Sequence, residues 1–278
     1  NGAKKKENYP LELGDIIEIR YLQSKQEKKA DTFMKVNSSG LMITYEDENI
    51  LVVEKWPGVL VHPDQRGVEP SLTDYVLSYL NGKGDYLPEK EKTFTPAPCN
   101  RLDRNTSGVV IFGKNFESLR TMNEMIREGY VKKYYNALVK GKIKDGIYKG
   151  YISKDENENI SKVFDEKRPN TKEIAMEVKT VQTNGAYSLL EIDLITGRSH
   201  QIRAHLGNPI IGDFKYGDKK LNSFFDNKFG LNYQFLYAYK LIFKKANGKL
   251  EYLNNKTVAE ALPPMFKKIK RDVFKFNI

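Results

Sequence analysis

Cysteine is almost absent from this sequence, and histidine is rare. Cys99 is the single cysteine among 278 residues, which excludes a disulfide within the chain and a zinc site built on cysteines. Of the three histidines, His200 and His205 are five positions apart, about 140° around a helix, so they would not share one face. Metal-binding helices instead place their histidines four positions apart. We therefore expect no metal site.

Long apolar runs are also missing. No stretch approaches the roughly 20 residues that cross a membrane as a helix. The first ten residues are polar and include Lys4, Lys5 and Lys6, unlike a signal peptide. Glycine-rich loops of the P-loop or dinucleotide-binding type are absent as well. These absences predict a cytoplasmic protein without a membrane partner or a cofactor, and we expect it to be a monomer.

Acidic residues are outnumbered by basic ones, 36 Asp and Glu against 46 Lys and Arg, so the formal net charge is +10. Such an excess favours a polyanionic partner, either nucleic acid or an acidic membrane surface. A basic surface that only keeps the protein soluble is the alternative. For a cytoplasmic protein, the charge favours action on nucleic acid.

The segment from residue 100 to 113 combines charged side chains with a predicted strand. Arg101, Asp103 and Arg104 place a carboxylate between two guanidinium groups. Small polar residues and a glycine follow, and then comes the apolar run 109–112, which indicates a buried strand. A polar loop that leads into a rigid strand often presents a reactive group. On these residues alone, the simpler alternative is a structural aspartate that pairs with arginine.

Further segments carry side chains suited to binding or chemistry. Residues 131–141 favour a strand and contain Tyr135, which could stack on a base and pass a proton, or could be an ordinary strand tyrosine. Residues 196–206 contain two arginines, two histidines and a glutamine, which fits a cationic, hydrogen-bonding surface. His62, which precedes Pro63, could carry a proton or order its loop.

Together these segments resemble, in chain order, the motifs of the RluA family of RNA pseudouridine synthases. Residues 101–108 are similar to the central motif of that family, and residues 55–63 are similar to its first motif. Residues 196–205 match the third motif at every specified position. Residues 133–141 and 212–217 are similar to two further family segments, one around a tyrosine and one of the form Gly-Asp-x-x-Tyr-Gly.

The resemblance implies roles for individual residues. Asp103 would be the catalytic residue, Tyr135 the active-site tyrosine, and Arg198 the partner that holds the carboxylate charged. We expect substrate contacts from charged and polar residues of the same motifs, namely Arg101, Arg104, His62, His200, Gln201 and Arg203. The chain departs from the common family pattern at Asn100, where many members have histidine, and at Pro57, which lies one position later than usual.

The implied activity is the isomerisation of uridine to pseudouridine in structured RNA. The reaction detaches the base from the ribose, rotates it and rejoins it through carbon, so it needs no cofactor. Asp103 would act either as a nucleophile at the ribose or as a base at the neighbouring carbon. Large-subunit ribosomal RNA is the first expectation for the substrate, and transfer RNA is the second. A non-catalytic RNA-binding protein on the same fold is the alternative, whereas a zinc-dependent deaminase is disfavoured because a Cys-x-x-Cys pair is absent.

The strand-rich pattern predicts an α+β fold with a mostly antiparallel mixed sheet flanked by helices. Residues 1–22 resemble the second half of the small RNA-binding domain named after ribosomal protein S-four, so we expect the chain to begin inside such a domain. We expect a linker at 23–40 and the catalytic domain at 41–278.

Periodicity and turn residues predict individual elements of the catalytic domain. We expect helices at 72–81 and 116–128, an Asn-Gly hairpin around 183–185, a strand pair at 235–243 and 250–253, and a basic helix at 266–271.

Overall fold

The structure is a computed structural model that describes residues 10, 12–14, 33–64, 68–91, 93–155 and 158–275. The chain divides into two compact units, Asn1–Thr32 and Phe33–Ile278. The RNA-binding domain expected over 1–22 lies outside the described residues, apart from Pro10 and residues 12–14. The helices and strands named below belong to the second unit.

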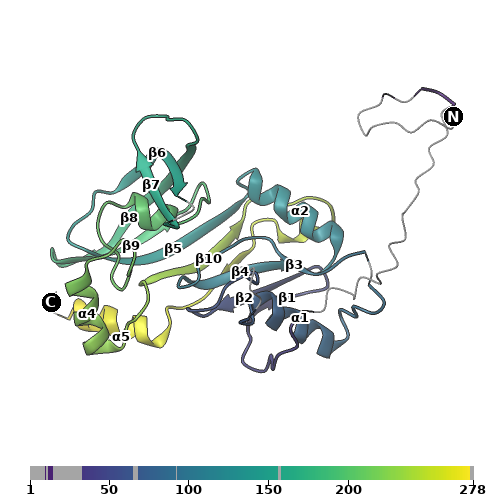
Figure 1. The fold of residues 1–278 in the computed structure, drawn as a ribbon, viewed down its shortest axis with the longest axis horizontal. Helices are drawn as coiled ribbons and strands as arrows, with labels where there is room; N and C mark the ends of the chain where they lie inside the picture. The colour runs from purple at the N-terminus through teal and green to yellow at the C-terminus, as the bar shows by residue number, and fades with distance from the viewer. Residues whose placement is uncertain are drawn as a thin grey trace. The chain divides into compact units, whose positions relative to one another are not determined.

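In the described part of the chain, eleven strands form one sheet (Figure 1). Its main order is β1-β2-β4-β10-β5-β9-β8-β6-β7, with β3 paired to β4 and β11 paired to β10. All of these pairings are antiparallel except that of β4 with β10. The strands are β1 (Met42–Glu46), β2 (Ile50–Lys55), β3 (Ala97–Pro98), β4 (Ser107–Gly113), β5 (Val131–Lys140), β6 (Gly146–Asp155), β7 (Ile160–Phe164), β8 (Lys172–Thr183), β9 (Tyr187–Asp193), β10 (Leu236–Phe243) and β11 (Thr257–Ala259). The α+β fold with a mostly antiparallel sheet is therefore confirmed.

Helices cover both faces of this sheet. They are α1 (Leu72–Lys83), α2 (Phe116–Arg127), α3 (Gln201–His205), α4 (Lys219–Phe229), α5 (Pro264–Val273) and the 3₁₀ helix η1 (Gly248–Leu253). Val110 of β4 belongs to the core cluster that includes α1, whereas its neighbour Val109 packs in the cluster that includes α2. On β5, Ala137 likewise belongs to the core cluster that includes α3, whereas its neighbour Leu138 belongs to the cluster that includes α5. Successive strand residues point to opposite faces, so α1 and α3 lie on one side of the sheet.

None of the helices in the described residues is long and apolar enough to cross a membrane.

The capped helices and the Asn-Gly hairpin form where the sequence predicts them. Ser71 caps α1 through a capping box with Asp74, and the Asn115 side chain caps α2. At the hairpin between β8 and β9, the Asn184 side chain accepts hydrogen bonds from the backbone amides of Ala186 and Tyr187, and Gly185 has a positive φ of 85°. These local signals succeed because each cap or turn is built from adjacent residues.

The strand expected at 250–253 is wrong, because these residues belong to the 3₁₀ helix η1. Leu250 and Leu253 are both fully buried in the same core cluster. Residues three apart lie on the same side of a 3₁₀ helix but on opposite faces of a strand. Strand β11, further along the chain, pairs with β10 instead.

Residues 33–40, which we expected to belong to the linker, pack on α1. The Met34 amide donates to Oδ1 of Asp74 at 2.9 Å, and the Val36 amide donates to Oγ of Ser78 at 3.0 Å. The Phe33 side chain packs against the core cluster of α1. The second unit therefore begins near Phe33.

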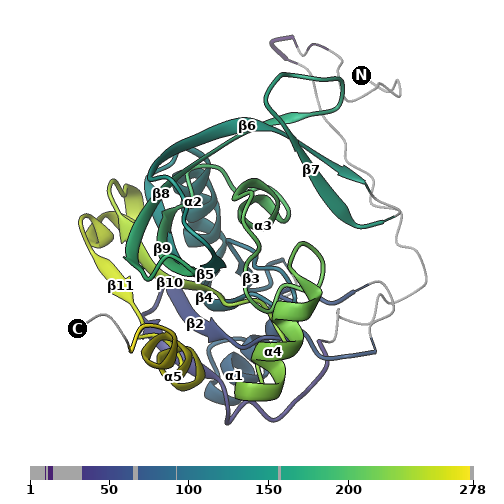
Figure 2. The same cartoon turned by 90° about the vertical axis from the view of Figure 1, so that its left-hand side faces the viewer.

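Strands β6 and β7 form a hairpin that reaches beyond the rest of the sheet and passes close to α3 (Figure 2). The short helix α3 faces the sheet near the loop between β3 and β4, which carries the central charged segment. This arrangement brings together parts of the chain that lie about one hundred residues apart.

Candidate active site

Asp103 lies in the loop that joins β3 to β4, and both ends of this loop are fixed. The Asn100 side chain accepts a hydrogen bond from the Ile111 amide at 2.8 Å, which holds the start of the loop against β4. At the other end, the Thr106 amide donates to the backbone carbonyl of Asp103 at 3.0 Å, and Gln234 donates to the Thr106 hydroxyl at 3.0 Å. The Asp103 side chain keeps 27% of its surface exposed, so a fixed carboxylate faces solvent.

Gly108, just after this loop, allows β4 to lie directly beside β10. Its φ is +123°, and a Cβ atom at this position would lie 2.2 Å from the backbone oxygen of Ala238. Any side chain would therefore force β4 and β10 apart. The glycine places the Asp103 loop next to the strands that carry the rest of the site.

Lys55, at the end of β2, holds the Asp103 loop through a hydrogen bond to its backbone. Its side chain is fully buried, and its ammonium group donates to the carbonyls of Trp56, Val59 and Arg104 at 3.1, 2.9 and 2.9 Å. Burial lowers the pKa of Lys55 to about 7, although the negative charge of Asp103 opposes this shift. Since Arg104 follows Asp103 directly, the bond to its carbonyl holds the backbone beside the carboxylate.

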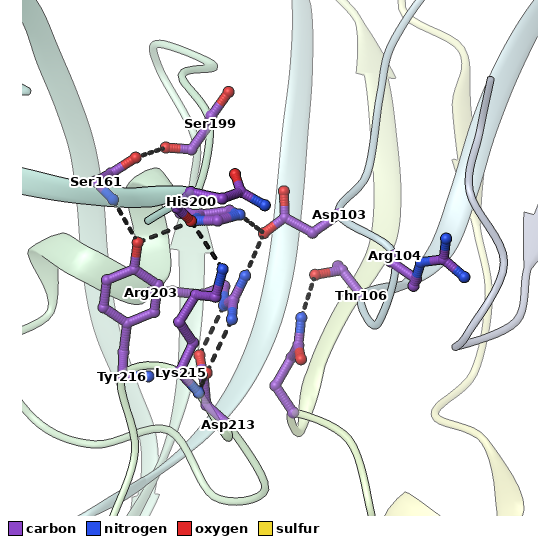
Figure 3. Close-up of polar contacts among 12 residues, drawn as sticks. Asp103, Arg104, Thr106, Ser161, Ser199, His200, Arg203, Asp213, Lys215 and Tyr216 are labelled. Carbon is purple, nitrogen blue, oxygen red and sulfur yellow. Dashed lines mark hydrogen bonds and ion pairs between the residues drawn. The ribbon is translucent and has the colours of Figure 1, made fainter. Parts of the chain in front are cut away.

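Arg203, on α3, forms the ion pair with Asp103 (Figure 3). Its Nη1 lies 2.9 Å from Oδ2 of Asp103. Its Nε and Nη2 bind the two carboxylate oxygens of Asp213 at 2.7 and 2.9 Å. One guanidinium group thus holds two carboxylates, and the planar, bidentate contact with Asp213 fixes its direction.

The partner expected for Asp103 was Arg198, and the structure corrects this pairing. Arg198 is exposed in the loop before α3, and its backbone amide binds Oε1 of Gln201 at 3.1 Å. Helix α3 begins only at Gln201, so it is the helix, carrying Arg203, that faces the Asp103 loop. Arg198 still lines the same cleft.

Asp213 is fully buried and serves as the anchor for Arg203. Besides the two bonds from Arg203, its Oδ1 accepts bonds from the backbone amides of Lys215 and Tyr216 at 2.9 and 3.1 Å. Burial alone would raise the pKa of Asp213, but these bonds and the charge of Arg203 outweigh it and hold the pKa below its ordinary value. Asp213 is therefore a charged anchor, in a role that the sequence pattern did not assign.

Tyr135 lies on β5 and is almost completely buried, with 5% of its surface exposed. Burial raises the pKa of its hydroxyl, and the negative charge of Asp103 raises it further. The phenol therefore stays neutral at ordinary pH. Lys133, two residues earlier on the same strand face, also lines the cleft, and burial lowers its pKa.

A cleft of about 980 Å³ collects nearly all of the residues that the sequence singled out. Its size suits a small molecule or a flipped nucleotide. Among the expected site residues, those that line it are Arg101, Asp103, Arg104, Tyr135, Arg198, His200, Gln201 and Arg203. His62 is exposed and does not line the cleft.

Two of the expected substrate-binding residues are engaged within the protein. Gln201 is buried, and its amide accepts bonds from Thr196 and the Arg198 backbone and donates to the Ala175 carbonyl. It therefore ties the loop before α3 to β8. Arg104 pairs with Glu69 at 2.7 Å on the surface. His200 lies 4.0 Å from the Asp103 carboxylate.

Across the described residues, no group of three or more His, Cys, Asp and Glu side chains is placed to hold a metal ion. The charged groups at the cleft form salt bridges and hydrogen bonds with one another instead. The cleft thus places a carboxylate, which a guanidinium contacts and orients, next to a neutral tyrosine.

Comparisons with known proteins show which family the chain resembles. The family model for RNA pseudouridylate synthase matches residues 49–208, which include the Asp103 loop, Tyr135 and Arg203. An uncharacterized RNA pseudouridine synthase of Mycoplasma capricolum is 34% identical over 258 residues, covering 90% of this chain and 80% of that protein. Ribosomal large subunit pseudouridine synthase C of Buchnera aphidicola is 35% identical over 258 residues, covering 87% and 76%.

Solved structures support the fold. The structure of human RNA Pseudouridylate Synthase Domain Containing 4 superimposes with a TM-score of 0.65 at 24% identity, covering 84% of this chain and 92% of that chain. The family match over more than half of the sequence and the relatives above 30% identity decide the assignment. The chain belongs to the RluA family of RNA pseudouridine synthases, isomerases that convert uridine in RNA to pseudouridine.

Proposed function

We propose that this enzyme isomerises uridines in large-subunit ribosomal RNA and that Asp103 is the group that reacts. The observation that supports the role of Asp103 most directly is its contact with Arg203 at the wall of the cleft. The ribosomal substrate is supported by the names of relatives such as the Buchnera aphidicola large-subunit synthase.

The proposed chemistry needs a carboxylate that is both ionised and correctly oriented. Whether it attacks the ribose or removes a proton from the neighbouring carbon, Asp103 must carry a negative charge when the bond between base and ribose breaks. Arg203 supplies a positive charge 2.9 Å away, and its second contact, with Asp213, keeps the guanidinium in place. The isomerisation neither adds nor removes atoms, so these protein groups suffice.

The target uridine has to leave its base stack to reach Asp103. Tyr135 lines the cleft beside Asp103, and its ring offers a surface on which the flipped base can stack. Because its hydroxyl is neutral, it can donate a hydrogen bond without adding a second negative charge next to the carboxylate. We assign Tyr135 to holding the base while it rotates.

The cleft also has cationic side chains that suit an RNA backbone. Arg101, Lys133, Arg198 and Lys215 line it together with Asp103. Lysine and arginine contacts to phosphates supply much of the affinity of proteins for nucleic acids. We propose that these four residues hold the phosphates on either side of the target nucleotide.

This proposal is tested by incubating the purified protein with a large-subunit ribosomal RNA transcript and, separately, with a transfer RNA transcript. Pseudouridine in the ribosomal transcript is the expected product, at sites that are also lost from ribosomal RNA of cells lacking the gene. Modification of transfer RNA alone would overturn the ribosomal substrate and leave the isomerase activity standing. Absence of pseudouridine in both transcripts would contradict the proposed function.

A further inference from the structure

Behind Asp103, two hydrogen bonds link strand β7 to His200, whose imidazole ring lies next to the carboxylate (Figure 3). The backbone amide of Ser161, on β7, donates to the Tyr216 hydroxyl at 2.6 Å. The same hydroxyl lies 2.9 Å from Nδ1 of His200. On the other side of the imidazole ring, Nε2 lies 4.0 Å from Oδ2 of Asp103.

We propose that Tyr216 is a positioning residue, which holds His200 as the tautomer that turns an Nε2–H group toward Asp103. This role rests on the proposed function of Asp103. It adds to Arg203 a second group that orients the carboxylate.

The hydrogen-bond partners of the Tyr216 hydroxyl favour this tautomer. The Tyr216 oxygen already accepts the proton of the Ser161 amide, so its own single proton is free to be donated to Nδ1 of His200. An imidazole nitrogen that accepts a hydrogen bond carries no proton. In the neutral ring the proton is then on Nε2, which faces Asp103.

The position of His200 is maintained by contacts on several sides. Its backbone has a φ of 56°, a left-handed conformation that residues other than glycine rarely adopt. The hydroxyl of Ser161 donates to the carbonyl of Ser199 at 2.8 Å, which fixes the preceding residue to β7. The Tyr216 ring also lies 5.0 Å from the Arg203 guanidinium, so one tyrosine contacts both groups that face Asp103.

Both groups approach the same carboxylate oxygen. Among the described residues, Nη1 of Arg203 donates a hydrogen bond to Oδ2 of Asp103 at 2.9 Å, and Nε2 of His200 lies 4.0 Å from the same oxygen. The other oxygen, Oδ1, is therefore the one available to the substrate. The chain from Ser161 to His200 thus helps to decide which face of the carboxylate meets the ribose.

Burial is the main reason that the pKa of His200 lies below its ordinary value. Burial lowers its pKa; the negative charges of Asp103 and Asp213 act in the opposite direction, and the positive charges of Arg203 and Lys215 lower the pKa further. Protonation at low pH would place a proton on Nδ1 and remove the acceptor for the Tyr216 hydroxyl. The rate should therefore fall on the acid side as His200 becomes protonated.

Tyr216→Phe tests the role of the hydroxyl, because it keeps the ring that contacts Arg203. In single-turnover reactions with saturating enzyme, on an RNA that the wild type modifies, we expect the rate to fall roughly tenfold, as for other lost outer hydrogen-bond partners. RNA affinity should stay within about twofold, because many cationic contacts remain. The acid limb of the pH profile should move to higher pH, since the hydrogen bond to Nδ1 stabilises neutral His200.

Tyr148→Phe is the matched control. Its hydroxyl donates to the Lys144 carbonyl at 2.8 Å, and it lies on β6, the strand that pairs with β7. We expect this variant to keep the wild-type rate and pH profile. The double variant Tyr216→Phe with His200→Gln should be no slower than His200→Gln alone, because Tyr216 acts through His200.

A second pair of variants keeps the proposal testable if Tyr216→Phe folds poorly. The glutamine amide of His200→Gln reaches the place of Nε2, whereas the shorter amide of His200→Asn reaches only that of Nδ1. We expect His200→Gln to be the faster of the two and to lose the acid limb. Three results would each overturn the positioning role. They are a wild-type rate and pH profile for Tyr216→Phe, equal rates for the two His200 variants, and a loss confined to RNA affinity. Failure of the wild type itself to form pseudouridine would instead refute the proposed function.

Discussion

Nη1 of Arg203 lies 2.9 Å from Oδ2 of Asp103, although one hundred residues separate the two in the chain. The same guanidinium binds Asp213 through Nε and Nη2. Arg203 therefore cannot turn away from Asp103 without breaking a buried, bidentate contact. This relationship makes Arg203 the residue that should distinguish catalysis from RNA binding.

Arg203→Ala should lower the single-turnover rate by about 100-fold or more, because the carboxylate loses both its counter-charge and its orientation. Arg203→Lys should recover only a small part, since an ammonium group cannot bind two carboxylates with the geometry of a guanidinium. Arg198→Ala is the matched control, because Arg198 lines the same cleft from the loop before α3, and it should mainly weaken binding. Equal losses of single-turnover rate in Arg198→Ala and Arg203→Ala would contradict the observed pairing.

Asp213→Asn should destabilise the protein by about 3 kcal/mol, because it leaves the buried Arg203 guanidinium with one charged partner fewer. The pKa of Asp213 is lower in the folded chain than in the unfolded one. The ionised carboxylate therefore stabilises the fold at pH values above the ordinary aspartate pKa of about 4, and this stabilisation is lost as the pH falls. Denaturant unfolding of wild type and variant at several pH values measures this. The two free energies of unfolding should approach each other below about pH 4, and a constant difference would argue against a charged Asp213.

Gly108→Ala should lower the free energy of unfolding by more than about 3 kcal/mol, because its Cβ would meet the Ala238 backbone at 2.2 Å in an unfavourable region of φ. Gly82→Ala is the control, since no atom lies within 4 Å of its Cβ and it sits in helix α1. That control should be neutral or stabilise by up to about 1 kcal/mol. Thermal or denaturant unfolding of both variants compares them directly, and equal stabilities would show that β4 and β10 separate easily.

RNA affinity should fall steeply with salt, because the basic excess of the chain implies several phosphate contacts, each of which releases counterions. The logarithm of the association constant should decrease linearly with the logarithm of the salt concentration. Lys133→Met should reduce the magnitude of this slope by about 1, the value expected for the loss of one phosphate contact, since Lys133 lines the cleft. An unchanged slope in this variant would remove Lys133 from the set of phosphate contacts.

The sequence was sufficient to find the Asp103 loop, Tyr135 and the α+β sheet, because these depend on contiguous motifs and on strand periodicity. It predicts Arg198 as the partner of Asp103, whereas the structure pairs Asp103 with Arg203. The two arginines occur in one motif, and the choice depends on where α3 begins and on Asp213, which comes from a separate segment.

The role of Lys55 was missed for a related reason. A lysine at the end of a strand is ordinarily a solvated residue, and only the folded chain encloses it among three backbone carbonyls. The sequence likewise predicts a strand where the 3₁₀ helix η1 forms, because a short apolar segment has no clear periodicity. Packing of Leu250 and Leu253 decides its form. Tertiary contacts supply the information that is missing in both cases.

The central claim, that Asp103 is the reacting group, is tested most directly by Asp103→Asn. The change removes the negative charge but keeps the size of the side chain, so circular dichroism and RNA affinity serve as controls for the fold. With saturating enzyme, single-turnover formation of pseudouridine should fall by more than about 1,000-fold, while wild-type protein converts the same RNA. A variant that retains a rate within about tenfold of the wild type would contradict the account.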